Sequence, residues 1–157
     1  MTRCAALALT LALSSAALAQ EAAIGLRTGD RALVAQLYAD LARGDVDAVA
    51  DVLSDRVVWL EGPHSPQAGS HVGGAAVSAH VLRPHNGRPA DVLHTLVVER
   101  DRVVATGASR RPDPATGRLI TTRFRHVWWL TDGRVTRVER SDDGPDLSNA
   151  LCGDSRC

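Results

Sequence analysis

Apolar positions in the first third of the chain recur at helical spacing. One face of the stretch from Asp30 to Ala42 is apolar, through Leu33, Val34, Leu37, Tyr38 and Leu41. Thr28 is a suitable N-cap and Gly44 a suitable C-terminal residue, so the pattern predicts a helix between them. Asp45 then caps a second, shorter helix, Val46 to Leu53.

The spacing changes after Arg56. Val57 to Leu60 is a short β-branched and aromatic run that ends before Gly62-Pro63, which indicates a buried strand. We expect a loop from Glu61 to Gly73, and then a third helix, Ala75 to Leu82, which Pro84 ends.

The second half of the chain is strand-like. Turn-forming residues separate four strands, which we expect at Val92 to Glu99, Val103 to Arg110, Leu119 to Leu130 and Val135 to Arg140. Asp132-Gly133 between the last two is a strong hairpin signal. Because short hairpins join antiparallel strands, helices followed by this meander predict an α+β fold.

The first residues have the pattern of a signal peptide. Arg3 precedes an apolar stretch from Cys4 to Leu18, and Ala17-Leu18-Ala19 has the small residues that signal peptidase requires. We therefore expect residues 1–19 to be removed before Gln20 and the protein to be exported, to the periplasm or beyond. The alternative is an uncleaved anchor, although about 15 apolar residues are short against the roughly 20 that span a bilayer.

Charge and cysteine content narrow the partners. The 18 basic and 18 acidic residues balance without runs of like charge, which indicates no nucleic-acid partner and, after cleavage, no membrane partner. The expected mature chain is a single domain, residues 20–145, with a tail, 146–157. In an oxidising compartment Cys152 and Cys157 could form a disulfide in that tail.

Three stretches resemble SnoaL-like proteins of the nuclear transport factor 2 superfamily, which also holds ketosteroid isomerases. They are Tyr38 to Ala48, Leu53 to Trp59, and Phe124 to Trp128 followed by Asp132 to Val135. The resemblance implies a cone: a curved, mixed but mostly antiparallel sheet wrapped around the N-terminal helices, with an interior pocket. It also implies a homodimer on the outer sheet face.

The predicted strand that contains His126 has two different faces. Alternate side chains share a face, so Phe124, His126 and Trp128 point one way. Arg123 and Arg125 point the other way, which makes the histidine face the interior one. His126 could transfer a proton to or from a carbonyl substrate. The alternative is a core histidine held by one hydrogen-bond partner.

Two carboxylates are candidate bases. Glu61 shares a face with Trp59 if the strand continues, which would place it at the pocket mouth, although it could equally be an exposed loop residue. Asp143 matches a frequent acidic position of the family, but Ser141 replaces the aromatic residue expected before it, and Asp142-Asp143 could simply end the strand. By resemblance, the ligand-binding residues are Tyr38, Trp59, Phe124 and Trp128.

Two functions follow from this pattern. One is cofactor-free proton transfer of isomerase, cyclase or dehydratase type on a small apolar carbonyl compound, with Glu61, His126 and Asp143 as catalytic residues. The other is a non-catalytic pocket or interaction module for a small apolar ligand. The spacing of His64, His71, His80 and His85 does not match known zinc patterns, so no metal is expected.

Overall fold

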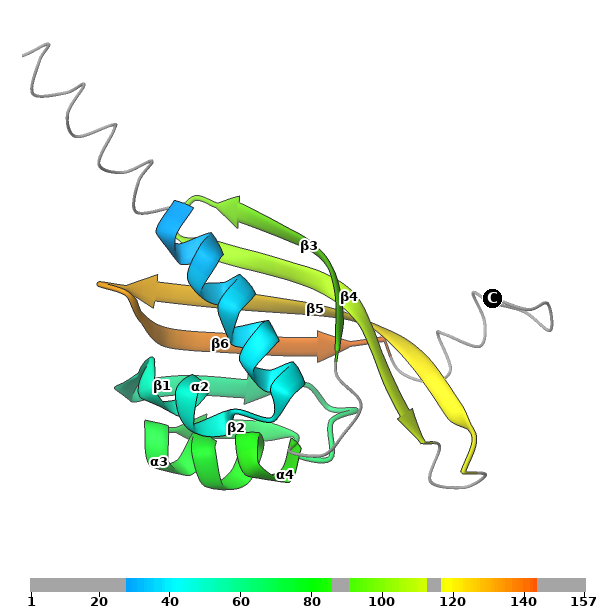
Figure 1. The fold of residues 1–157 in the computed structure, drawn as a ribbon. Coiled ribbons are helices and arrows are strands. Elements are labelled where there is room, and N and C mark those ends of the chain that lie inside the picture. Colours follow the sequence, from blue (N-terminus) through cyan, green and yellow to red (C-terminus); the bar gives the residue numbers. More distant parts are fainter. Residues whose placement is uncertain (1–27, 86–90, 113–116, 144–157) are drawn as a thin grey trace, which may run out of the picture.

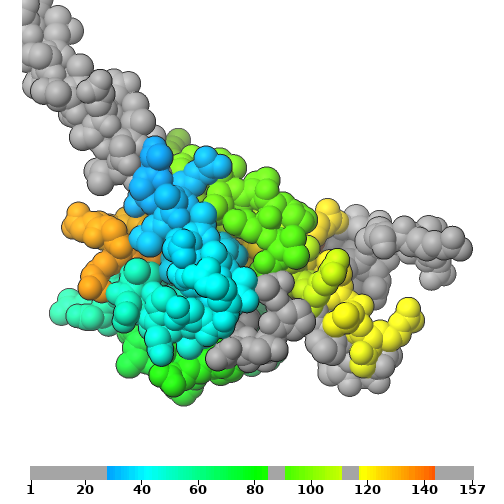
Figure 2. Space-filling model, in the orientation of Figure 1, coloured from blue at the N-terminus to red at the C-terminus, as the bar shows by residue number. Residues whose placement is uncertain are grey.

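The computed structural model describes residues 28–85, 91–112 and 117–143 of the chain. Its first helix, residues 28–43, lies across one face of a strongly twisted sheet (Figure 1). In the space-filling view, this helix covers the middle of the face that the picture presents (Figure 2). The predicted signal peptide and the predicted Cys152–Cys157 disulfide lie outside the described residues.

The sheet has six strands in the order β2-β1-β6-β5-β4-β3. The strands are β1 (Leu53–Glu61), β2 (Gly69–Val72), β3 (Val92–Glu99), β4 (Arg102–Pro112), β5 (Leu119–Thr131) and β6 (Arg134–Asp142). β3 to β6 form the expected antiparallel meander, and β1 pairs with β6 in parallel. The predicted fold class, a mixed and mostly antiparallel sheet with N-terminal helices, is confirmed.

The β5–β6 hairpin follows its turn chemistry. Asp132 and Gly133 have φ values of 50° and 72°. Positive φ at both central residues is what a type I′ turn requires, and this turn matches the twist of the strands that it joins. The predicted Asp132-Gly133 hairpin is therefore confirmed.

Several predicted boundaries were wrong around β1. α2 (Val46–Asp51) is shorter than expected, because Leu53 already begins a nine-residue strand whose parallel pairing with β6 starts at Leu53 and Val135. Glu61 is the last residue of that strand rather than the first of a loop. Within the predicted loop, Gly69–Val72 forms β2 against β1.

The third helical segment does not end before Pro84. It runs through α3 (Gly74–Val77), a π-helix (Ser78–Leu82) and α4 (Arg83–His85). In the π-helix the Arg83 N–H bonds to the Ser78 carbonyl. This shifts the bonding pattern just before Pro84, whose ring would clash with the i−4 carbonyl of a regular α-helix.

Candidate functional site

Two layers of side chains cross the interior face of the sheet next to each other. The first, here called the apolar layer, is formed by register partners on β1, β6, β5 and β4 and consists of Trp59, Val138, Trp128 and Val103. All four side chains are buried. Because side chains on one face repeat every second residue, the next layer begins two positions further along each strand.

That next layer, here called the charged layer, consists of Glu61, Arg140 and His126. Arg140 is the register partner of Glu61 on β1 and of His126 on β5. Strand pairing alone therefore places a carboxylate, a guanidinium and an imidazole side by side. His126 and Glu61 are buried, with 3% and 9% of their surface exposed.

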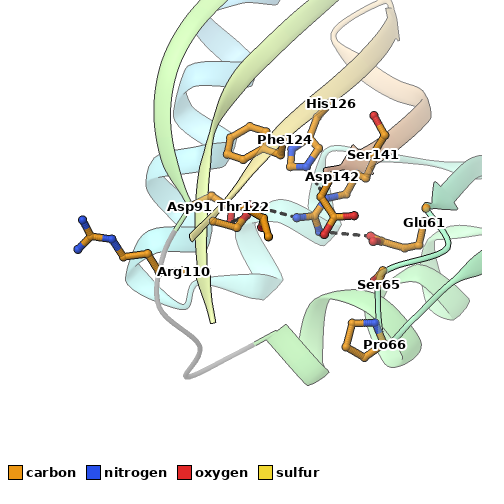
Figure 3. A pocket seen from close by; sticks show the side chains of 13 residues that line it. Glu61, Ser65, Pro66, Asp91, Arg110, Thr122, Phe124, His126, Ser141 and Asp142 are labelled. Carbon is orange, nitrogen blue, oxygen red and sulfur yellow. Dashed lines mark hydrogen bonds and ion pairs between the residues drawn. The ribbon is translucent and has the colours of Figure 1, made fainter. Parts of the chain in front are cut away.

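Arg140 is the centre of the charged layer. Its Nη1 donates to Glu61 Oε1 at 3.2 Å, and its Nη2 donates to Asp91 Oδ2 at 3.1 Å. Its Nε donates to His126 Nε2 at 3.2 Å. The hydrogen bonds to Glu61 and Asp91 are drawn as dashed lines in Figure 3. One cation thus holds two carboxylates and a histidine.

The two carboxylates are held from their other sides as well. Trp59 Nε1 donates to Glu61 Oε1 at 2.7 Å, so an apolar-layer residue fixes a charged-layer residue. Ser109 Oγ donates to Asp91 Oδ1 at 2.5 Å. Both hydrogen bonds of Glu61 use Oε1, and Oε2 has no partner among residues 28–85, 91–112 and 117–143.

Tyr38 from the first helix connects the two layers. Its hydroxyl lies 2.6 Å from His126 Nδ1 and 3.4 Å from Trp128 Nε1. Arg140 can only donate, so His126 Nε2 accepts, and the neutral ring must carry its proton on Nδ1. His126 therefore donates to the Tyr38 oxygen, which fixes the tautomer.

Burial and charge shift two pKa values in this network. Burial raises the pKa of Tyr38 far above its ordinary value, against the opposing effects of Arg140 and of the Trp128 hydrogen bond. Burial alone would lower the pKa of Arg140, but the charges of Glu61 and Asp91 outweigh it and raise that pKa. Tyr38 is therefore a neutral phenol and Arg140 a permanent cation.

The charged layer lines a small cavity of about 80 Å³. Glu61, Arg140 and His126 lie beside Asp91, Asp142, Arg110, Thr122 and Ser109 in its wall (Figure 3). This cavity is well below the roughly 300 Å³ at which sites for drug-sized ligands begin. Most side chains in its wall are polar or charged, whereas the sequence predicted an apolar ligand.

Phe124 depends on a glycine opposite it. Its ring stacks on His126 with centroids 4.1 Å apart. A Cβ on Gly107, its register partner on β4, would lie 2.5 Å from Phe124 Cζ and 2.2 Å from the Val92 carbonyl oxygen. Gly107 therefore leaves the space in which Phe124 orients the imidazole.

The structure brings together most of the predicted site residues. Phe124, His126 and Glu61 line the cavity, and Tyr38 contacts His126. The lining does not include Trp59 and Trp128, which belong to the apolar layer.

Asp143 does not share the cavity. Its carboxylate lies 3.5 Å from the exposed Arg123. The neighbouring Asp142 lies in the cavity wall instead, because alternate residues of a strand share a face. Arg140 and Asp91 were missed by sequence reasoning. A signal for Arg140 existed, because it lies two positions after the apolar Val138 and so shares its face.

Two features, a metal-binding cluster and a membrane-spanning helix, are absent from the described residues. No group of three or more His, Cys, Asp or Glu side chains within them could hold a metal ion. Nor do they contain a helix that is long and apolar enough to cross a membrane.

The sequence pattern of the SnoaL-like domain matches residues 34–138, from the first helix to β6. The chain belongs to the SnoaL-like family. The matched range contains Tyr38, Glu61 and His126 and stops just before Arg140. No protein of curated function matches the sequence.

Solved structures share the fold of this SnoaL-like protein. A protein from Burkholderia thailandensis described as NTF2-like is 24% identical, covers 78% of this chain and 96% of its own, and has a TM-score of 0.67. TerC, co-crystallised with polyporic acid, is 21% identical and has a TM-score of 0.63. The match covers 73% of this chain and 92% of TerC. A putative polyketide cyclase from Xanthomonas campestris is 23% identical and has a TM-score of 0.58. The match covers 73% of this chain and 90% of the cyclase.

Together, these likenesses show that the chain has the fold of SnoaL-like and NTF2-like proteins.

Proposed function

We propose that this protein catalyses cofactor-free proton transfer next to the carbonyl group of a small molecule. The observation that carries the proposal is the state of Glu61. The carboxylate is buried at the cavity wall, one oxygen is fixed by Trp59 and Arg140, and the other oxygen has no hydrogen-bond partner among the described residues. A positioned carboxylate with one open oxygen is suited to act as a general base.

The proposed reaction is an enolisation. Glu61 Oε2 removes the proton from the carbon next to the carbonyl, the C–H electron pair forms the carbon–carbon double bond, and the carbonyl π pair moves onto oxygen. Glu61 then returns the proton to carbon or oxygen, so atoms and electrons balance without a redox partner.

Arg140 is the group that would stabilise the enolate oxygen. A guanidinium has five N–H groups, and each of the three nitrogens of Arg140 gives one to the protein. One N–H remains on each Nη, without a partner in the described part of the chain. A fixed cationic donor beside a developing oxyanion contributes strongly to such reactions. His126 and Asp91 position it.

The test is deuterium incorporation from D₂O at the α-carbon of small carbonyl compounds, followed by NMR. Glu61→Gln keeps the shape of the side chain but removes the base, so we expect the rate to fall at least about 100-fold. Glu139→Gln is the matched control, because Glu139 precedes Arg140 on the outer face and pairs with Arg137. Equal rates in both variants would refute the assignment.

A non-catalytic binding protein is the second candidate. It is favoured by the network itself, because every nitrogen of Arg140 already has a protein partner when no ligand is present. A non-catalytic binding protein would retain its ligand chemically unchanged. Phe124→Ala would then weaken ligand binding, and no turnover would be detected in either the wild type or the variant.

We further propose that the protein is exported and dimeric. Support for export comes from the apolar stretch Cys4 to Leu18 and the small residues that follow it. The mature protein should begin at Gln20, which N-terminal sequencing can establish. The half-exposed Val97 on the outer sheet face supports a homodimer there, which sedimentation analysis can test.

A further inference from the structure

Thr122 is a buried polar residue whose hydroxyl is unsatisfied within the described part of the chain. Only 1% of its surface is exposed, and its Oγ1 has no hydrogen-bond partner among those residues. Burying a hydroxyl without a hydrogen bond is unfavourable, so such groups in a cavity wall point to a ligand or water that completes them. Thr122 lies in the wall of the cavity that contains Glu61 (Figure 3).

The surroundings of Thr122 are also polar. Its register partner on β4 is Ser109, whose hydroxyl is already committed to Asp91. In the present arrangement Ser109 forms no hydrogen bond with Thr122 Oγ1. The strand alternation also places Thr122 four residues from His126 on the same face, one step beyond Phe124. Thr122 thus lies along the wall beside the charged layer, and its side chain must rotate to present Oγ1 to a ligand held there.

Charge and size limit what that ligand can be. The wall carries three carboxylates, Glu61, Asp91 and Asp142, against the guanidinium of Arg140. Arg110 is exposed, and its guanidinium points away from the cavity (Figure 3). This balance disfavours an anionic ligand. The volume of about 80 Å³ favours a ligand of a few non-hydrogen atoms over a polycyclic one.

We propose that the substrate is a small, neutral carbonyl compound with a hydroxyl group, and that Thr122 Oγ1 binds this hydroxyl. The proposal rests on the proposed function, in which Glu61 removes a proton next to the carbonyl. It replaces the apolar ligand predicted from the sequence with a hydroxylated one. Thr122 is then a residue that determines specificity.

The test compares hydroxyacetone with butanone, in which a methyl group takes the place of the hydroxyl. Binding is measured by ligand-observed NMR and catalysis by α-deuterium exchange. Wild-type protein should favour hydroxyacetone roughly tenfold or more, because a site with a buried hydrogen-bonding group discriminates against an analogue that leaves it unpaired. Thr122→Val keeps the shape of the side chain but removes its hydroxyl. This variant should weaken the binding of hydroxyacetone only, and so reduce the preference to a ratio near one.

Thr121→Val is the matched control, because Thr121 is exposed on the opposite face of β5. An equal preference for both ketones in the wild type, or an unchanged preference in Thr122→Val, overturns the substrate class. If butanone is exchanged in a Glu61-dependent manner, the proposed function survives that failure. If hydroxyacetone binds through Thr122 but neither ketone is exchanged, the ligand class stands and the catalytic function falls.

Discussion

The apolar layer and the charged layer occupy the same face of the same strands, two residues apart. Trp59, Val138 and Trp128 bury apolar surface, which stabilises the fold. Glu61, Arg140 and His126 are desolvated instead, and the attraction within a buried ion pair often does no more than offset that cost. The apolar layer therefore stabilises the fold, and the energetic cost of the charged layer supports our proposal that this layer serves chemistry.

Removing bulk from the apolar layer should have the largest effect on stability. Trp128 is 1% exposed and packs edge-on against Trp59, so Trp128→Ala should lower the free energy of unfolding by about 3–5 kcal/mol. Urea denaturation measures this. Trp129→Ala is the control: its ring lies on the outer face near Arg102 and Arg137, and we expect a clearly smaller loss. Equal losses would show that burial in the apolar layer does not account for the stability that Trp128 contributes.

Removing the cation from the charged layer should be the next largest effect. Arg140→Met leaves Glu61 and Asp91 without their common partner, so stability should fall by about 3 kcal/mol. Arg137→Met breaks only a surface pair with Glu139 and should cost less than about 1 kcal/mol. Thermal unfolding of the two variants compares them directly, and a harmless Arg140→Met would argue against a coupled network.

Tyr38, which connects the layers, should produce a measurable pH dependence. It is the single tyrosine of the chain, so its ultraviolet absorbance reports one group. Its pKa is raised by burial, so above about pH 10 the unfolded chain loses a proton that the folded chain keeps. Stability should therefore fall with rising pH by up to about 1.4 kcal/mol per unit, and Tyr38→Phe should remove that slope. A native tyrosine that ionises near pH 10 would contradict the burial argument.

The smallest expected effect is at the contact between the layers. Trp59→Phe keeps an aromatic ring in the apolar layer but removes the N–H that donates to Glu61. We expect a stability loss of about 1 kcal/mol and a lower exchange rate at unchanged ligand affinity. Calorimetry and the deuterium assay separate the two, and an unchanged rate would show that Trp59 does not position the base.

Much of this arrangement was readable from the sequence. Alternation placed Phe124, His126 and Trp128 on one face, and the same reasoning placed Glu61 beside Trp59. The helix and hairpin signals were local, so the order of elements followed from them. β2 was missed because Gly69–Val72 has no alternating pattern of its own and depends on pairing with β1.

The pairing that assembles the charged layer could not be predicted from the sequence. Arg140 is 79 residues from Glu61, and only the parallel β1–β6 register places them together. Asp91 precedes β3 and has no strand pattern that would indicate which way it points. The alternation of β6 indicates the face of Arg140, but nothing in the sequence indicates that Arg140 meets Glu61, His126 and Asp91. Their meaning depends on tertiary pairing.

The most direct test of the account replaces both charges together, in Glu61→Leu/Arg140→Met. If the charged layer serves chemistry, this variant should be more stable than Arg140→Met alone, because removing Glu61 leaves only Asp91 without its cationic partner. Exchange of α-deuterium should disappear at the same time. A variant no more stable than Arg140→Met, or exchange at the wild-type rate, would contradict the claim that this layer is functional.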